Sequence, residues 1–248
     1  MKKFALLTSV LLTAPFSMSN VSAQCVASQD CASLGYTETS CESGGIKCPF
    51  GNAWACPQSG GCTYGSVYYS DGTCINKYIA DKTPIGVIAY DEDGEKWIIA
   101  LENASSTQVW STEEIDVPEI ENYTTTETVI NDMKSCENTE AMLALGADKY
   151  PAAAAAKNYA PTAARDTKGK WCLPAMGMWH IMSEHSVEIN FGINLTKNSN
   201  FISGGTYWTS SEYNKNSAWT KSTLMSVYNK YSTGNIISNH TVRPIMKI

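Results

Sequence analysis

Hydrophobic and polar positions follow a different pattern on the two sides of about residue 80. Downstream, two apolar runs, PIGVIAY and KWIIAL, flank a short acidic turn that contains Asp93-Gly94. An Asp-Gly pair between two apolar runs is a strong signal for a β-hairpin. Apolar residues occupy both alternating sets of positions in the runs. We therefore expect this hairpin to lie in the centre of a sheet that is covered on both faces.

Three later segments carry helix signals, after a polar loop over residues 103–131. In NTEAMLALG, Asn138 is the expected N-cap and Gly146 the stop. Pro151 is the expected first residue of an alanine-rich helix, and Pro174 has that role in LPAMGMWHIMSEH. In this last helix, one face carries the apolar residues Ala175, Met178, Trp179 and Met182, which predicts the side that packs on the core.

The C-terminal part reads as short strands separated by Asn, Ser and Gly: TYWTSSE, NSAWTKS, LMSVYNKY and TVRPIMKI. Pro244 lacks a backbone N–H, so we expect an edge position or a local bulge there. Rings on such strands usually bury one face, and Trp208 and Trp219 are the expected core residues. The fold class predicted for this part is α+β.

The region before residue 80 is rich in Cys, Gly, Ser and Pro and poor in aliphatic residues, so cross-links must stabilise it. The cysteine spacings are not the CxxC pairs of a zinc site, and disulfides are the expected role. The odd total of nine cysteines leaves one thiol free or paired with another molecule. Seven lie in this region, and their pairing stays open: Cys25, Cys31, Cys41, Cys48, Cys56, Cys62 and Cys74.

Residues 1–23 have the charged start, apolar run and small-residue cleavage site of a secretory signal peptide. We expect a secreted, periplasmic or cell-surface protein with a disulfide-rich segment at 24–80 and a larger domain at 83–248. No stretch of about 20 apolar residues predicts a membrane span. The formal net charge of −6 argues against nucleic acid and anionic membranes as partners.

Four segments occur in a characteristic order: KTPIGVIAYDEDGEKWIIAL, GKWCLPAMGMWHIM, GGTYWTSSEYNKNSAW and VRPI. Together they resemble the Fibrobacter succinogenes major paralogous domain and the related C-terminal domain of the Legionella collagen-like adhesins. The resemblance covers about residues 83–248. It implies a C-type-lectin-like fold, an antiparallel sheet with two or three helices in which the first hairpin pairs with the final strand. Met178 departs from the pattern, because many members carry an acidic residue there.

The positions that match the family pattern are implied by the resemblance to be mainly fold determinants. They are Trp171, Leu173, Pro174, Trp208, Ser210, Ser211, Glu212, Trp219, Arg243 and Pro244.

Candidates for catalysis are few. His180, Glu184 and His185 form H-x-x-x-E-H, one residue longer than the inverted zinc-protease motif, and His185 turns about 100° away from Glu184 on an ideal helix. The acidic hairpin turn lacks the remaining ligands of a calcium loop. There is no G-x-S-x-G elbow. We therefore expect no metal, no cofactor and no enzymatic activity.

The alternative is a hydrolytic enzyme or one of formylglycine-generating type, since formylglycine-generating enzymes share the broad fold class and use reactive cysteines. Cys136 and Cys172, each just before a predicted helix, are interpreted instead as a disulfide that ties the helical layer.

The sequence-based hypothesis is a non-catalytic binding or adhesion module for a glycan or protein ligand. A second alternative is a structural subunit of a surface assembly, in which the odd cysteine joins copies through a disulfide. Tyrosines need a partner or water for each hydroxyl, so they favour the surface more than the tryptophans do. The candidate ligand-binding residues are Tyr207, Glu212, Tyr213, Asn214, Asn216, Tyr228 and Tyr231.

Overall fold

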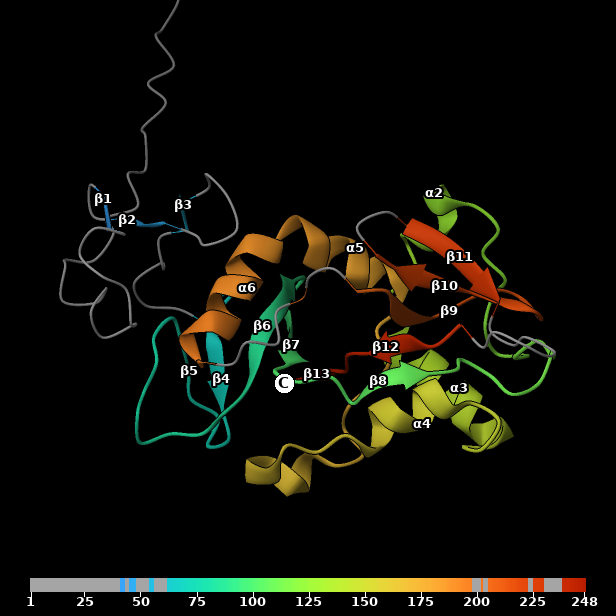
Figure 1. The fold of residues 1–248 in the computed structure, drawn as a ribbon, viewed down its shortest axis with the longest axis horizontal. Coiled ribbons are helices and arrows are strands. Elements are labelled where there is room, and N and C mark those ends of the chain that lie inside the picture. Colours follow the sequence, from blue (N-terminus) through green and yellow to red (C-terminus); the bar gives the residue numbers. More distant parts are fainter. Residues whose placement is uncertain are drawn as a thin grey trace, which may run out of the picture.

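The structure is a computed structural model that describes residues 62–197, 202, 205–222 and 238–248, together with the backbone of four short strands outside these ranges. Its main body is α+β, with two five-stranded sheets next to each other and helices packed around them (Figure 1). Three of the four additional strands form a small antiparallel sheet: β1 (Cys41–Glu42), β2 (Gly45–Lys47) and β3 (Trp54–Ala55).

The first sheet has the order β13-β7-β6-β4-β5 and is built around the expected hairpin. Asp93 and Gly94 both have positive φ, 52° and 79°, as the tight turn requires, so this prediction is confirmed. The strands of this sheet are β4 (Val67–Tyr69), β5 (Cys74–Ile75), β6 (Pro84–Glu92), β7 (Glu95–Ala100) and β13 (Ile245–Lys247).

The first sheet starts upstream of Thr83, where the sequence suggested that the larger domain begins. β4 pairs with β6, and the Cys62–Cys74 disulfide connects the segment before β4 to the first residue of β5. This part of the cysteine-rich region therefore belongs to the main body.

The second sheet has the order β11-β10-β9-β12-β8 and is mixed, because β12 runs parallel to β9. Its central strands carry many hydroxyl side chains. Its strands are β8 (Ser105–Gln108), β9 (Tyr207–Asn214), β10 (Ser217–Lys221), β11 (Met225–Asn229) and β12 (His240–Val242).

The chain passes from the second sheet to the first at Arg243 and Pro244. The single strand expected over TVRPIMKI is therefore wrong: β12 and β13 lie in different sheets. Proline has no backbone N–H, and Pro244 lies between the two strands while its carbonyl accepts from Ala100 N. β13 is the edge strand of the first sheet and pairs with β7, the second strand of the hairpin.

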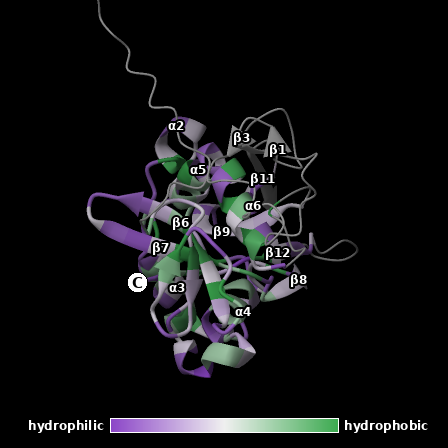
Figure 2. Cartoon of the chain, turned by 90° about the vertical axis from the view of Figure 1, so that its left-hand side faces the viewer, coloured by the Kyte–Doolittle hydropathy of each residue, from purple (hydrophilic) through white to green (hydrophobic). Residues whose placement is uncertain are grey.

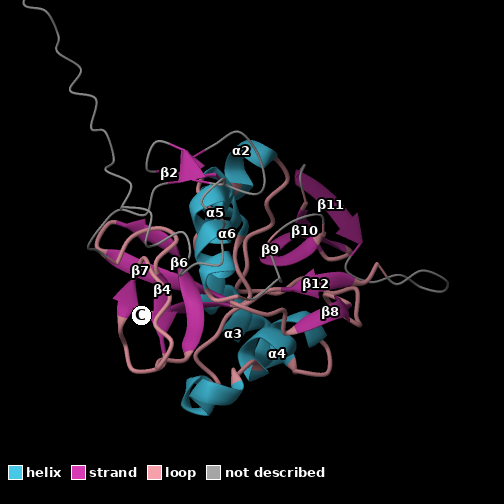
Figure 3. Ribbon diagram, turned by 60° about the vertical axis from the view of Figure 1, so that its left-hand side comes forward, coloured by secondary structure: helices cyan, strands magenta, loops and turns pink. Residues whose placement is uncertain are grey.

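Among the described residues there are five α-helices and one 3-10 helix. α5 and α6 follow each other along the first sheet, and α3 and α4 cover the opposite side of the second (Figures 1 and 3). They are α2 (Thr126–Val129), α3 (Ser135–Leu145), α4 (Pro151–Asn158), the 3-10 helix η2 (Thr162–Thr167), α5 (Met176–Glu184) and α6 (Ser186–Leu195). No helix among the described residues has the length and apolar character to cross a membrane.

Two of the expected helix starts need correction. α3 begins at Ser135, so Asn138 lies inside the helix, where its side chain bonds to Asp132 instead of capping. α5 begins at Met176, because the carbonyl of Pro174 accepts a hydrogen bond from Ser210 N and does not start the helix. Pro151 is the first residue of α4, as expected. α6 and β8 were not predicted.

The hydrophobic core lies between the sheets and their helices, and Figure 2 shows hydrophobic residues gathered where β6, α5 and α6 meet. The expected core face of α5 is confirmed: Ala175, Met178, Trp179 and Met182 are all buried. Trp208 and Trp219 are buried too, but in different clusters. Trp208 packs with residues of α4, and Trp219 packs with residues of α5.

Candidate binding surface and the polar core beneath it

The β9–β10 hairpin carries most of the candidate ligand-binding residues, and the structure divides them. Tyr207 and Glu212 are buried, with exposed fractions of 5% and 0%, so their assignment to a binding surface is wrong. Tyr207 packs on Trp179 with the ring centroids 5.0 Å apart. Burial raises the pKa of its phenol. Glu212 lies inside because its Oε2 accepts from Val117 N at 3.0 Å.

Tyr213, Asn214 and Asn216 remain partly exposed at the tip of the same hairpin. The Tyr213 ring lies edge-on to Trp219 at 5.7 Å, which fixes its orientation while one side stays open. Asn214 Oδ1 accepts from Asn216 N at 2.9 Å and shapes the turn. Tyr228 lies in β11, where its backbone pairs with Ala218 of β10. The side chain of Tyr228 and the whole of Tyr231 lie outside the described residues.

Tyr123 joins this hairpin tip from a distant part of the sequence. Its backbone N–H donates to the carbonyl of Glu212 at 3.0 Å, and its own carbonyl accepts from Trp219 Nε1 at 2.8 Å. The side chain is half-buried, and burial raises its pKa to about 12. The sequence gave no signal for this contact, because 96 residues separate Trp219 from Tyr123. Tyr123, Tyr213, Asn214 and Asn216 make up what we call the tyrosine surface.

Beneath the tyrosine surface lies a buried carboxylate, Asp132, with only 1% exposure. Its Oδ2 accepts from Ser211 Oγ at 2.5 Å and from Asn138 Nδ2 at 3.0 Å, and its Oδ1 accepts from Lys134 N at 3.1 Å. Burial raises its pKa, and these hydrogen bonds oppose the rise. The carboxylate thus connects the segment before α3, α3 itself and β9.

The serines of the YWTSSE segment connect β9 to α3 and α5. Ser211 Oγ accepts from Met176 N at 2.9 Å, at the start of α5. Ser210 Oγ accepts from Asn138 Nδ2 at 3.4 Å, and Ser210 N donates to Pro174 O at 2.8 Å. Both serines are fully buried. Their hydroxyls therefore serve the fold and do not face a ligand.

Arg243 holds the crossing between the two sheets. Its guanidinium is fully buried and donates from Nε to Ala100 O at 2.7 Å and from Nη2 to Leu101 O at 2.8 Å. Nη1 donates to Asn103 Oδ1 at 3.0 Å. Burial lowers its pKa to about 10, so it remains a cation at neutral pH. Its planar fork matches the two successive carbonyls at the end of β7.

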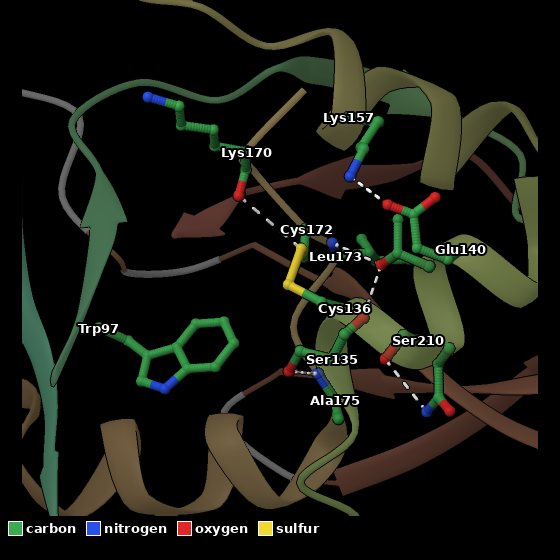
Figure 4. Close-up of a disulfide and its surroundings, with 12 residues drawn as sticks. Trp97, Ser135, Cys136, Glu140, Lys157, Lys170, Cys172, Leu173, Ala175 and Ser210 are labelled. Carbon is green, nitrogen blue, oxygen red and sulfur yellow. Dashed lines mark hydrogen bonds and ion pairs between the residues drawn. A yellow bond between two sulfur atoms is a disulfide. The ribbon is translucent and has the colours of Figure 1, made fainter. Parts of the chain in front are cut away.

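Cys136 and Cys172 are joined by a disulfide with the Cα atoms 5.1 Å apart (Figure 4). The bridge connects α3 to the segment before α5, where Cys172 also exchanges backbone hydrogen bonds with Ile245 of β13. Next to it, Thr139 Oγ1 accepts from Leu173 N at 3.0 Å, and Ser135 Oγ accepts from Ala175 N at 2.8 Å. The two sulfurs are thus part of a structural junction.

Of the seven N-terminal cysteines, Cys62 and Cys74 pair with each other. The side chains of Cys25, Cys31, Cys41, Cys48 and Cys56 lie outside the described residues, as does the expected signal peptide.

The histidine motif does not assemble into a metal site. Glu184 is exposed at the end of α5, and His185 lies between α5 and α6, where it stacks on Tyr64 with the ring centroids 3.6 Å apart. Across the part of the chain that the structure describes, no three His, Cys, Asp or Glu side chains are arranged to hold a metal ion.

Comparisons with known proteins identify one structural similarity. No family model and no curated protein matches the chain. The structure is similar to that of a fimbrial protein from Bacteroides ovatus ATCC 8483, with a TM-score of 0.52 and 14% sequence identity. The match covers 75% of this chain and 49% of that one, so the chain spans about half the length of the fimbrial protein. At this identity the similarity concerns the fold.

Proposed function

We propose that this chain is an exported, non-catalytic surface module of the adhesion type, which binds a glycan or protein ligand through the tyrosine surface. The observation that carries the proposal is the division of the β9–β10 hairpin. The hairpin's tryptophans, its glutamate and its three serines are buried, whereas Tyr213, Asn214 and Asn216 stay partly exposed at the tip next to Tyr123.

The chemistry of this tip suits binding. Tyrosine offers an apolar ring and a hydroxyl at low conformational cost, a combination enriched in recognition surfaces. The asparagine side chains can donate from their amide nitrogens, and Asn214 Oδ1 is already fixed by Asn216 N. Because Tyr213 is held edge-on by Trp219, its ring needs little further ordering when a ligand arrives.

The side chains that could carry out acyl transfer or acid–base catalysis have structural roles instead. Asp132, Ser211 and Glu212 are buried and hydrogen-bonded to backbone or to one another. The formylglycine-generating alternative uses reactive thiols, whereas Cys136 and Cys172 form a disulfide. These facts support a binding role over an enzymatic one.

The C-type-lectin-like reading of the fold is part of the proposal. The pairing of β13 with the β6–β7 hairpin and the packing of α5 and α6 on the first sheet support it. So does the burial of the positions that match the Fibrobacter succinogenes major paralogous domain.

The test compares ligand binding by the purified mature chain with binding by two tyrosine variants, on a glycan array and in a pull-down with cell-surface proteins. Tyr213→Ala should weaken binding by about tenfold, equivalent to about 1.4 kcal/mol. Tyr213→Phe keeps the ring and separates stacking from hydrogen bonding. Tyr78→Ala alters a half-buried tyrosine elsewhere and is the matched control. Unchanged binding by Tyr213→Ala would remove the tyrosine surface from the proposal.

A second candidate is a structural subunit of a surface assembly, which the similarity to a fimbrial protein favours. Fold alone does not transfer function, so the readout must be direct. Labelling of intact cells with a membrane-impermeant reagent should mark the chain, and non-reducing gels of sheared surface material should show whether the odd cysteine links copies. A chain that stays unlabelled and inside the cell contradicts both candidates.

A further inference from the structure

One stretch of the chain carries many carboxylates and no cation. No lysine or arginine occurs between Lys96 and Lys134. In this interval, the segment leading into and through α2 presents six carboxylates that are exposed or half-buried. We call these residues the acidic surface: Glu113, Glu114, Asp116, Glu119, Glu121 and Glu127. Ile115, exposed by 38%, and the exposed Pro118 add apolar area among them.

A surface of opposite sign follows α4. Arg165, Lys168 and Lys170 are exposed in and directly after η2, and we call them the basic surface. Asp166 is exposed among them, so three positive charges stand against one negative charge. The Lys170 side chain extends away from the Cys136–Cys172 disulfide (Figure 4). Arg165 is the exposed one of the two arginines, since Arg243 is buried.

Glu113, the first residue of the acidic surface, and the basic surface lie at opposite ends of α4. Glu113 forms an ion pair of 3.0 Å with Lys149, which precedes the first residue of α4. The basic surface begins beyond the last residue of that helix, and eight helical residues span about 12 Å. In Figures 1 and 3, α2 lies at the top of the molecule and η2 at the bottom. The α2 end of the acidic surface is therefore well separated from the basic surface within one molecule.

We propose that the acidic surface of one copy of this chain binds the basic surface of a second copy. Because the two surfaces differ, each contact leaves one free surface of each sign, so copies join head to tail. Carboxylates and the Arg165 guanidinium match in charge and can pair in bidentate geometry. Ile115 and Pro118 supply the apolar centre that a charged rim alone lacks. The inference rests on the proposed role at a surface and names a partner for it.

Sedimentation velocity of the mature chain tests this contact, with free thiols alkylated and a chelator present to exclude disulfide and cation bridges. The wild type should associate at low ionic strength. It should dissociate in about 1 M salt, where the screening length falls to about 3 Å. Lys168→Glu/Lys170→Glu and Glu114→Lys/Glu119→Lys should each weaken association by about tenfold or more, because like charges then face each other. An equimolar mixture of the two variants should associate again, since the reversed surfaces are complementary.

Matched controls change the same charges elsewhere: Lys77→Glu/Lys215→Glu and Glu184→Lys/Glu188→Lys, all at exposed positions. They should associate like the wild type. Where a reversed variant melts early, Lys168→Gln/Lys170→Gln replaces it, with a smaller loss expected. A monomeric wild type at low salt, unchanged association of both reversed variants, or a mixture that stays monomeric overturns the proposal. These outcomes leave ligand binding through the tyrosine surface and surface labelling as separate readouts, so failure here is distinguishable from failure of the proposed function.

Discussion

The central strands of the two sheets are both buried but use different chemistry. In the first sheet, the inner residues of the hairpin are aliphatic, such as Val87, Ile88 and Ile99. In the second, Thr209, Ser210 and Ser211 are fully buried in the central strand. A buried hydroxyl destabilises the fold unless it is hydrogen-bonded, so the second sheet depends on partners from distant parts of the chain. The buried polar residues of this sheet, which resemble a site in the sequence, are structural.

The largest expected effect comes from the residue that holds the two halves together. Arg243→Ala should lower the free energy of unfolding by about 4 kcal/mol, because it removes a large buried side chain and leaves the carbonyls of Ala100 and Leu101 without their donors. Arg165→Ala, at an exposed position, should change it by less than about 0.5 kcal/mol. Urea unfolding measures both. Similar values for the two variants would mean that Arg243 does not couple the sheets.

A smaller loss of stability is expected from overpacking in the part of the molecule around the first sheet, which we call the apolar half. A Cβ at Gly192 of α6 would lie 2.1 Å from Gly65 O and 2.6 Å from Val87 Cγ1. Gly192→Ala should therefore destabilise by about 2 to 3 kcal/mol through overpacking. Gly94→Ala places its Cβ in open space, and only the positive φ of 79° opposes it, at a cost of roughly 1 kcal/mol. Thermal unfolding of Gly192→Ala and Gly94→Ala compares the cost of overpacking with the cost of a strained backbone. Equal melting temperatures would contradict the larger loss expected at Gly192.

The smallest expected effect is a change of stability with pH in the part of the molecule around the second sheet, which we call the polar half. Burial raises the pKa of Asp132 in the folded state above its unfolded value. Its favourable contribution is therefore complete below the unfolded pKa and is lost as the pH rises through the folded pKa. Stability of the wild type relative to Asp132→Asn should fall as the pH rises through the folded-state pKa of Asp132.

Asp71 provides a control of opposite sign. Hydrogen bonding to Lys82 lowers its pKa to about 2, so stability relative to Asp71→Asn should fall as the pH decreases toward that value. Melting temperatures of the wild type and the two variants as a function of pH check both signs. Parallel curves for all three proteins would mean that neither carboxylate changes its pKa on folding.

The sequence predicted the apolar half well, because its information is local. The hairpin, its turn and the core face of α5 follow from contiguous runs and from helical spacing. Pro151 likewise starts α4 because its own fixed φ suits that position.

The polar half was harder to predict, for two physical reasons. Alternation along β9 does not separate core from surface, because Tyr207 packs toward α5 while Trp208 packs toward α4, and both faces are covered. Asn138 looked like a cap, but its partner is Asp132, whose burial depends on β9. Tyr123 was missed for a similar reason, since its position is set by contacts with Glu212 and Trp219 far along the chain.

The order of the strands has a consequence for synthesis and folding. β8 is an edge strand whose ladder partner in the second sheet is β12, and β12 begins at His240. A ribosome must therefore add more than a hundred residues before β8 can enter its sheet, and the edge strand β13 joins β7 only afterwards. Such long-range pairing slows folding and leaves strand edges uncovered in the meantime. Both sheets thus receive a strand only when the C-terminal residues have been made, although β4 to β7 can pair much earlier.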